Sequence, residues 1–322
     1  MQGRLTDSVP AFPADDPMKQ GPAAVHENDR RRFADAGNYH LHCEFSDDSR
    51  ERMENQIEQA IALGLDEICF TDHVDYGIKK DWSEGGIQWR GSDSVSSGAE
   101  GLDPMANVNY PEYFSKLDRM RETYRGRITI KKGLEFGIQT HTCGQYRRLY
   151  DTYRKELDFV LLSMHQVHDQ EFWTQDFQRS RSQREYNEEY YREIYEVQKI
   201  FKDYSVLAHL DLICRYDRNG IYPFEKVKDL IAEILTLAIR DGKGIELNTS
   251  SWKYGLPDTQ PSRDILRLYK DLGGRIITVG SDAHTAARMG DHLEEAYRIL
   301  RDEIGFTHIC TFDKMEPVFH SL

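Results

Sequence analysis

The sequence of 322 residues has few cysteines, and their spacing matches neither a disulfide framework nor a thiolate metal site. The five cysteines form an odd set without a CxxC pair, and Cys43, Cys69 and Cys310 lie within apolar runs. Thiols in apolar runs are typical of the reduced interior of an intracellular protein, whereas small secreted proteins carry even, closely spaced sets. We therefore expect free cysteines and a cytoplasmic protein.

Long apolar runs and an excess of positive charge are also absent. No run approaches the roughly 18–20 apolar residues of a membrane-spanning helix, and the first residues contain no apolar segment of a secretory signal. The net charge is −13, which disfavours non-specific binding to nucleic acid. We expect neither a membrane nor a nucleic acid as partner, and no pattern indicates an oligomeric state.

Strand-like and helix-like segments alternate after a polar N-terminal stretch. Residues 1–36 contain four prolines and no periodicity, which predicts a flexible extension. Strands are predicted over residues 38–43, 66–71, 127–134, 157–163, 205–209, 243–248, 275–280 and 307–312. Helices are predicted over residues 49–63, 110–125, 142–155, 184–203, 223–241, 261–272 and 290–303. Seven or eight successive β/α units favour one barrel domain over 37–319.

Residues 77–109 interrupt this alternation. The segment is rich in glycine and serine and holds Trp82 and Trp89. A loop of this length is uncommon in a compact domain unless it has a function or is disordered. We expect an insertion that forms a flap over the mouth of the barrel, with a plain surface insertion as the alternative.

Histidines and acidic residues stand at the ends of the predicted strands. His40 and His42 alternate along one strand and therefore share a face, and later strands end in Asp72-His73, Glu135, His165, His209 and Asp282-Ala283-His284. Each of these taken alone fits an ordinary structural role equally well. Their shared position at the carboxyl ends of successive strands, where barrel enzymes build active sites, predicts one metal site. Imidazole and carboxylate are ligands of Zn, Mn and Fe.

These residues match the pattern of a known family. The motifs are His40-x-His42-xxx-Ser46-x-Asp48, Thr71-Asp72-His73, Gly133-x-Glu135, Ser163-x-His165, His209-Leu210-Asp211 and Gly280-Ser281-Asp282-Ala283-His284. Over residues 37–319 the chain resembles the PHP (polymerase and histidinol phosphatase) superfamily, and within it the histidinol-phosphate phosphatases. Residues 1–36 and the Gly/Ser-rich segment 85–101 depart from the pattern of that subfamily.

The resemblance implies an α/β fold, a distorted (β/α)7 TIM-like barrel, that binds three divalent metal ions (Zn, Mn or Fe). Carried over residue by residue, it places metal one on His40, His42, Glu135 and Asp282, metal two on Glu135, His165 and His209, and metal three on Asp48, His73 and His284. The implied reaction is hydrolysis of a phosphate monoester, L-histidinol phosphate in histidine biosynthesis. The implied nucleophile is a hydroxide that bridges metals one and two.

The remaining roles rest on residue type and position. Arginine suits phosphate because its planar fork matches the oxygens, so Arg215, and after it Arg288, are expected to bind the phosphoryl group. Asp72, His168 and a metal-bound water are the alternatives for the general acid. Candidates for contact with the aminoalcohol are Tyr76, Trp173 and Asp75.

Other functions stay open at this point. The same metals would serve another PHP phosphoesterase that acts on a nucleotide, a sugar phosphate or phosphotyrosine. A non-catalytic metal-binding PHP domain is a further alternative. An amidohydrolase-type barrel also begins with HxH, but it carries a carboxylated lysine where this sequence has Glu135.

Overall fold

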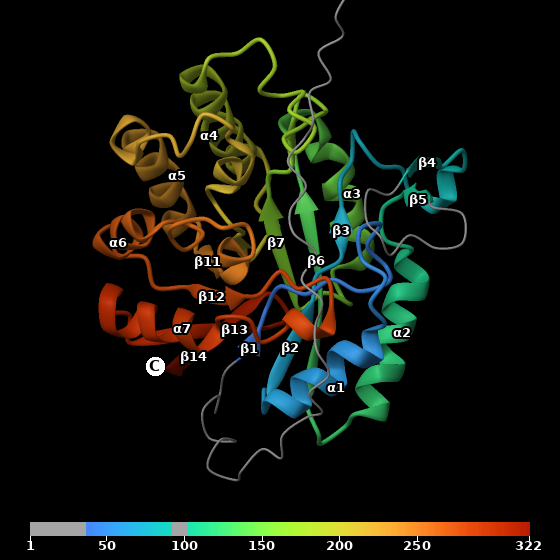
Figure 1. Cartoon of the computed structure of the whole chain (residues 1–322). Coiled ribbons are helices and arrows are strands. Elements are labelled where there is room, and N and C mark those ends of the chain that lie inside the picture. The colour runs from blue at the N-terminus through green and yellow to red at the C-terminus, as the bar shows by residue number, and fades with distance from the viewer. Residues whose placement is uncertain (1–36, 92–101) are drawn as a thin grey trace, which may run out of the picture.

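The structure is a computed structural model that describes residues 37–91 and 102–322 (Figure 1). The predicted flexible extension over residues 1–36 and the middle of the predicted insertion, residues 92–101, lie outside the described residues. Strand and helix boundaries agree with the sequence expectation to within a few residues at most ends.

Seven parallel strands form a nearly closed barrel, as the resemblance implies. Their order is β1 (Gly37–Asn38), β2 (Glu67–Phe70), β6 (Thr129–Gly137), β7 (Phe159–Ser163), β10 (Val206–Leu207), β11 (Gly244–Asn248) and β12 (Ile277–Gly280), with β3 (His73–Val74) on the free part of β6. The chain after β1 meets β12 through Tyr39 N–Val279 O and His42 N–Ala283 O bonds of 3.0 Å each. These bonds close the ring, so the carboxyl ends of all strands surround one point.

Helices follow the strands and cover the outside of the barrel (Figure 1). They are α1 (Met53–Leu63), α2 (Tyr110–Thr123), α3 (Cys143–Tyr153), α4 (Gln183–Ile200), α5 (Lys228–Arg240), α6 (Arg263–Asp271) and α7 (Leu293–Arg298), which continues as a π-helix over Ile299–Ile304. The first turn of α4 is capped by Ser182 and Glu185, whose side chains bond each other's backbone N–H groups. α1 ends at Gly64, which adopts the left-handed conformation that glycine favours at helix ends.

The eighth predicted strand, residues 307–312, does not join the barrel. It forms β13 (His308–Asp313), which pairs antiparallel with β14 (Glu316–Ser321). Cys310 and Phe312 of β13 pack in a buried cluster that includes Tyr39 and Phe159. Sequence periodicity indicates that a strand is buried but not which strand it pairs with. A strand inside the barrel and a strand packed against its outside give the same apolar pattern.

The described parts of the predicted insertion include two short antiparallel strands, β4 (Gln88–Gly91) and β5 (Leu102–Met105), which lie near the start of α2 (Figure 1). Asn107 anchors the base of the insertion, because its side chain accepts from Asp75 N at 2.8 Å and donates to Asp81 at 3.0 Å. Closure over the barrel mouth stays a prediction.

All five cysteines are free, as expected, and Cys43, Cys69, Cys143 and Cys310 are buried. Among the helices of residues 37–91 and 102–322, none combines the length and the apolar character needed to cross a membrane.

Candidate metal centre

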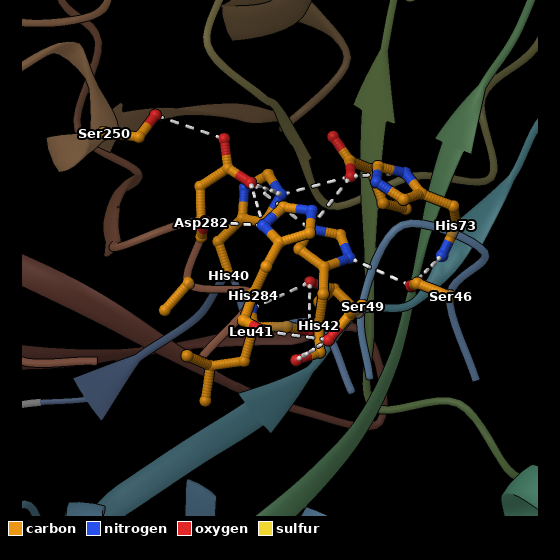
Figure 2. A network of polar contacts seen from close by, with 12 residues as sticks. His40, Leu41, His42, Ser46, Ser49, His73, Ser250, Asp282 and His284 are labelled. Atoms are coloured by element: carbon orange, nitrogen blue, oxygen red, sulfur yellow. Dashed lines mark hydrogen bonds and ion pairs between the residues drawn. The ribbon is translucent and has the colours of Figure 1, made fainter. Parts of the chain in front are cut away.

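The nine residues predicted as ligands lie in one cluster at the carboxyl ends of the barrel strands. Figure 2 shows part of it, with His40, His42, His73, Asp282 and His284 turned toward one another. The full set is His40, His42, Asp48, His73, Glu135, His165, His209, Asp282 and His284. Segments up to 244 residues apart in sequence therefore meet here because parallel strands of a closed barrel end on one face.

Glu135 occupies the centre of the cluster and is fully buried. Its Oε1 lies 2.8 Å from His209 Nε2 and 3.1 Å from His165 Nε2, whereas its Oε2 lies 3.1 Å from His40 Nε2. Burial opposes ionisation, but the imidazoles of His40, His165 and His73 hold the pKa of this carboxyl well below its usual range. The carboxylate thus presents one oxygen to each of two groups of histidines.

The group around Oε2 has the dimensions of a four-ligand site. His42 Nε2 lies 3.4 Å from both Glu135 Oε2 and Asp282 Oδ1, and His40 Nε2 lies 3.7 Å from Asp282 Oδ1. Ligands about 2.0–2.1 Å from one ion in tetrahedral geometry are separated by about 3.4 Å. Buried Asp282 is also ionised, because His40, His42 and Arg215 outweigh the effect of burial and keep its pKa well below the usual range.

The buried polar atoms of the cluster test whether it fits metal ions. His40 Nε2, His42 Nε2, His73 Nδ1, His209 Nδ1 and Glu135 Oε2 are buried without a hydrogen-bond partner. Such atoms are rare in native proteins, because each loses its hydration without compensation. Here they gather in one cluster of imidazole nitrogens and carboxylate oxygens, so the arrangement fits divalent ions that bind His and carboxylate ligands.

A third group lies toward solvent. Asp48 Oδ2 is 3.0 Å from His284 Nε2 and 3.5 Å from His73 Nε2. The Asp48 side chain is 52% exposed, in contrast to the buried Glu135 and Asp282. Asp48 is therefore the most exposed of the nine residues, and its side of the cluster faces solvent.

Two further carboxylates contact histidine rings of the cluster at the ring nitrogen that points away from it. Glu246 Oε1 lies 2.7 Å from His40 Nδ1, and Asp75 Oδ1 lies 2.7 Å from His165 Nδ1. Each leaves the Nε2 atom of its histidine facing the cluster, the arrangement that orients metal-binding histidines and raises their basicity. A Cβ atom at Gly137 would lie 1.9 Å from Asp75 Oδ1, so only glycine leaves room for this contact.

The backbone is constrained at two of the strand ends. His209 and Asp282 have φ angles of 24° and 53°, values that non-glycine residues adopt rarely and at a cost. Asp282 N bonds His40 O at 2.9 Å, and His209 N donates to Glu246 at 3.0 Å. These bonds hold both side chains toward the cluster despite the unfavourable backbone.

Arg215 contacts the carboxylate of Asp282, and its expected role as a phosphate ligand stays a prediction. Its Nη1 and Nη2 both lie 3.1 Å from Asp282 Oδ2, and Nη2 also donates to Ser250 Oγ at 2.5 Å. Its Nε donates to Gln260, and its side chain is only 4% exposed. The guanidinium therefore fixes Asp282 from the side opposite His40 and His42.

The contacts of Asp72 correct its expected catalytic role. The carboxylate is fully buried and accepts from Cys43 N at 2.8 Å and Ser46 Oγ at 2.7 Å. Burial raises its pKa to about 6 despite these bonds. Ser46 Oγ lies 3.2 Å from His42 Nδ1. Asp72 therefore supports the loop after β1 and reaches His42 only through Ser46, so it is not placed to protonate a leaving group.

Three other candidates lie in different surroundings, and the roles expected for them stay predictions. His168 is 60% exposed and pairs with Glu189 on α4 at 3.1 Å. Tyr76 is 4% exposed, and its hydroxyl donates to Asp81 at 2.8 Å, so it belongs to the core. Trp173 is 44% exposed and follows the short strand β9 (Gln170–Glu171). Sequence position near a strand end does not determine where a side chain points once the loop turns.

Arg288, by contrast, lines a pocket next to the cluster. The pocket has a volume of about 90 Å³ and reaches Ser250, Ser281 and Asp282. Its outer walls include Lys253, Arg288 and Asp291, and the rings of Trp252 and His292, which stack 4.6 Å apart. The wall thus combines flat apolar surface with charges of both signs.

Glu246 was the main residue that sequence reasoning missed. It lies within the buried strand β11, where every residue is buried. A carboxylate in the middle of an apolar buried strand needs a partner, and that signal in Gly244–Asn248 could have identified it. Lys79 and Asp47 gave no comparable signal, because they lie in polar loops.

Comparisons with known proteins are consistent with this geometry. The PHP domain family matches residues 38–250. The histidinol-phosphatase of Lactococcus lactis subsp. lactis is 31% identical over 86% of this chain and 94% of that protein. The histidinol-phosphatase of Saccharomyces cerevisiae is 20% identical over 86% of this chain and 92% of that protein. The crystal structure of the Lactococcus lactis histidinol phosphate phosphatase, complexed with zinc, L-histidinol and phosphate, superposes with a TM-score of 0.71 at 30% identity. That superposition covers 88% of this chain and 98% of the other.

Proposed function

This chain belongs to the PHP domain family, and we propose that it is a metal-dependent phosphatase that hydrolyses L-histidinol phosphate to L-histidinol and phosphate. The observation that carries the proposal is the cluster of buried imidazoles and carboxylates around Glu135 at the carboxyl end of the barrel. The Lactococcus lactis relative supports the substrate, because it matches nearly full length and its crystal structure holds zinc, L-histidinol and phosphate. The cytoplasmic location expected from the cysteines stays a prediction.

Three divalent ions fit the three groups of ligands. We assign the first ion to His40, His42, Glu135 and Asp282, the second to Glu135, His165 and His209, and the third to Asp48, His73 and His284. The close approaches within each group support this assignment. When bound, the ions would neutralise the phosphoryl oxygens and increase the acidity of water at the site.

The protein's own residues position the groups that act on the substrate. Glu135 shares its two oxygens between the first and second sites, and Glu246 and Asp75 hold His40 and His165 in place. Arg215 holds the Asp282 carboxylate. Because Asp48 is half exposed while Glu135 is buried, we infer that the phosphoryl group approaches from the Asp48 side.

We infer that the pocket beside Asp282 receives the organic part of the substrate. An aminoalcohol with an imidazole ring carries a flat ring and a positive charge. The pocket offers the stacked Trp252 and His292 rings as a flat wall and Asp291 as a carboxylate. Arg288 lies 3.2 Å from Asp291 and sets how much negative charge that carboxylate presents to the ligand.

Replacing Arg288 by alanine should change the KM for L-histidinol phosphate by about 3- to 10-fold, which corresponds to about 0.7–1.4 kcal/mol. The kcat should change less, because the residue does not contact the metal ligands. Steady-state kinetics measure both. Arg298 offers a matched control: it is also 50% exposed and forms a 3.2 Å ion pair, with Glu303. An unchanged KM in Arg288→Ala would remove the pocket from substrate binding.

Phosphate release from a panel of monoesters tests the function. We expect kcat/KM for L-histidinol phosphate to exceed that for p-nitrophenyl phosphate, a nucleotide, a sugar phosphate and phosphotyrosine. Protein stripped of metal should lose turnover and regain it when zinc or manganese is added. A better rate on another monoester would identify a different phosphoesterase, and three bound ions without any turnover would indicate a non-catalytic metal-binding domain.

A further inference from the structure

A buried lysine joins two of the proposed metal sites. Lys79 Nζ lies 2.6 Å from Asp47 Oδ1 and 2.8 Å from Asp75 Oδ2, and its side chain is only 10% exposed. Lys79 N also donates to Asp75 O at 2.8 Å, which holds the two residues in a fixed turn. The contact with Asp75 is therefore set by local backbone geometry as well as by charge, whereas the contact with Asp47 joins two separate loops.

The carboxylates of Asp75 and Asp47 connect Lys79 to two different metal sites. Asp75 uses its other oxygen, Oδ1, to hold His165 Nδ1 at 2.7 Å, and His165 belongs to the second site. Asp47 directly precedes Asp48, whose carboxylate lies 3.0 Å from His284 in the third site. The chain of contacts His165–Asp75–Lys79–Asp47 thus runs from the second site to the loop that carries a ligand of the third.

We propose that Lys79 is a positioning residue that couples the second and third metal sites, by fixing Asp75 behind His165 and Asp47 beside Asp48. This inference rests on the proposed function for the identity of the sites. Lys79 lies outside the motifs that carry the resemblance.

Charge and burial explain why a cation is needed at this place. Asp47 is 16% and Asp75 6% exposed, and two buried carboxylates that face one region without a cation repel each other. Removal of Lys79 would let Asp47 turn toward solvent and would carry Asp48 with it. It would also leave Asp75 free to rotate away from His165. Loss of such outer contacts typically weakens metal binding about 10- to 100-fold.

Lys132 provides a matched control. Its Nζ also bridges two carboxylates, Asp118 at 2.6 Å and Glu156 at 2.7 Å, and its side chain is 3% exposed. Neither carboxylate contacts a residue of the metal cluster in these bonds. A general effect of removing a lysine that pairs with two acids should therefore also appear in Lys132→Met, where the acids are 61% and 45% exposed, whereas an effect on the metal sites should not.

The test measures zinc in Lys79→Met, Lys79→Arg and Lys132→Met, by metal analysis and competition with a chelator. Anomalous diffraction from crystals of each variant gives the occupancy of each position. We expect Lys79→Met to bind zinc at the second and third positions about 10- to 100-fold more weakly, with the first position unchanged. Lys79→Arg should recover most of this affinity, because it keeps the charge, and Lys132→Met should bind zinc like the unaltered protein.

Wild-type zinc affinity at both positions in folded Lys79→Met would overturn the inference, and so would an equal loss in Lys132→Met. If Lys79→Met does not fold, Asp47→Asn replaces it: this variant should weaken the third position alone, and unchanged zinc there would overturn the link through Asp47. The zinc measurements do not depend on turnover. A protein that fails to hydrolyse L-histidinol phosphate would therefore refute the proposed function without deciding the role of Lys79.

Discussion

The Glu135→Gln variant should lose about 10²- to 10³-fold in kcat for phosphate release, which corresponds to about 3–4 kcal/mol of transition-state stabilisation. The change keeps the shape of the side chain but removes the charge that two groups of histidines share. Glu135 Oε1 lies 2.8 Å from His209 Nε2, and Glu135 Oε2 lies 3.1 Å from His40 Nε2. The amide of glutamine would offer a weak oxygen ligand to one site and an NH2 group, which does not bind a metal ion, to the other.

Single-turnover or steady-state phosphate release measures the loss, and metal analysis of the same sample shows how many ions are held. Asp158→Asn is the control, because Asp158 is equally buried but lies at the start of β7, where it pairs with Arg121 and Lys314. Near-wild-type turnover in Glu135→Gln would refute the assignment of Glu135 as the residue shared by two sites.

Replacing Arg215 by alanine should lower the free energy of unfolding by about 3–5 kcal/mol, because it leaves the buried Asp282 carboxylate without its cation. Both Nη atoms lie 3.1 Å from Asp282 Oδ2, and the ring of Tyr254 packs 4.5 Å from the guanidinium carbon. Activity should fall with stability, since Asp282 belongs to the first site. The Arg215→Lys variant keeps the charge without the fork and should show a smaller loss of both.

Urea unfolding and steady-state kinetics separate this role from phosphate binding. A residue that only binds the phosphoryl group would raise the KM in Arg215→Ala and leave the free energy of unfolding unchanged. That result would support the role expected from sequence and contradict the geometry described above.

The strand-end histidines could be predicted as site residues because several of them occupy the same position at the ends of successive strands. His165 alone is indistinguishable from a core histidine. Six segments that each end in a His, Asp or Glu predict one site, because parallel strands bring their carboxyl ends together. Glu246 was missed because it lies inside a strand rather than at its end. Only the fold, in which β12 lies between β11 and the chain after β1, shows that it holds His40.

The roles assigned to loop residues were less predictable. Asp72 stands at a strand end like the true cluster residues, but its carboxylate turns toward Cys43 and Ser46. Asp75, Tyr76 and Lys79 lie close together in a single loop, but their side chains point to different places. Tyr76 lies in the core, Asp75 holds His165, and Lys79 bridges two carboxylates. Loop direction depends on turns and on partners far away in sequence, which residue type does not encode.

The sequence by itself determined the class of fold and the position of the cluster at the barrel mouth, because these follow from periodicity and from what strand ends share. The full set of nine residues, with Asp48 in a loop, came from the resemblance of the motifs to a known family. The tertiary structure alone decided which atoms face one another. It showed that Arg215 pairs with Asp282, and that Lys79 pairs with Asp47 and Asp75. Buried charges must find partners of opposite sign, and those partners lie wherever the fold brings them, at sequence distances that no local pattern records.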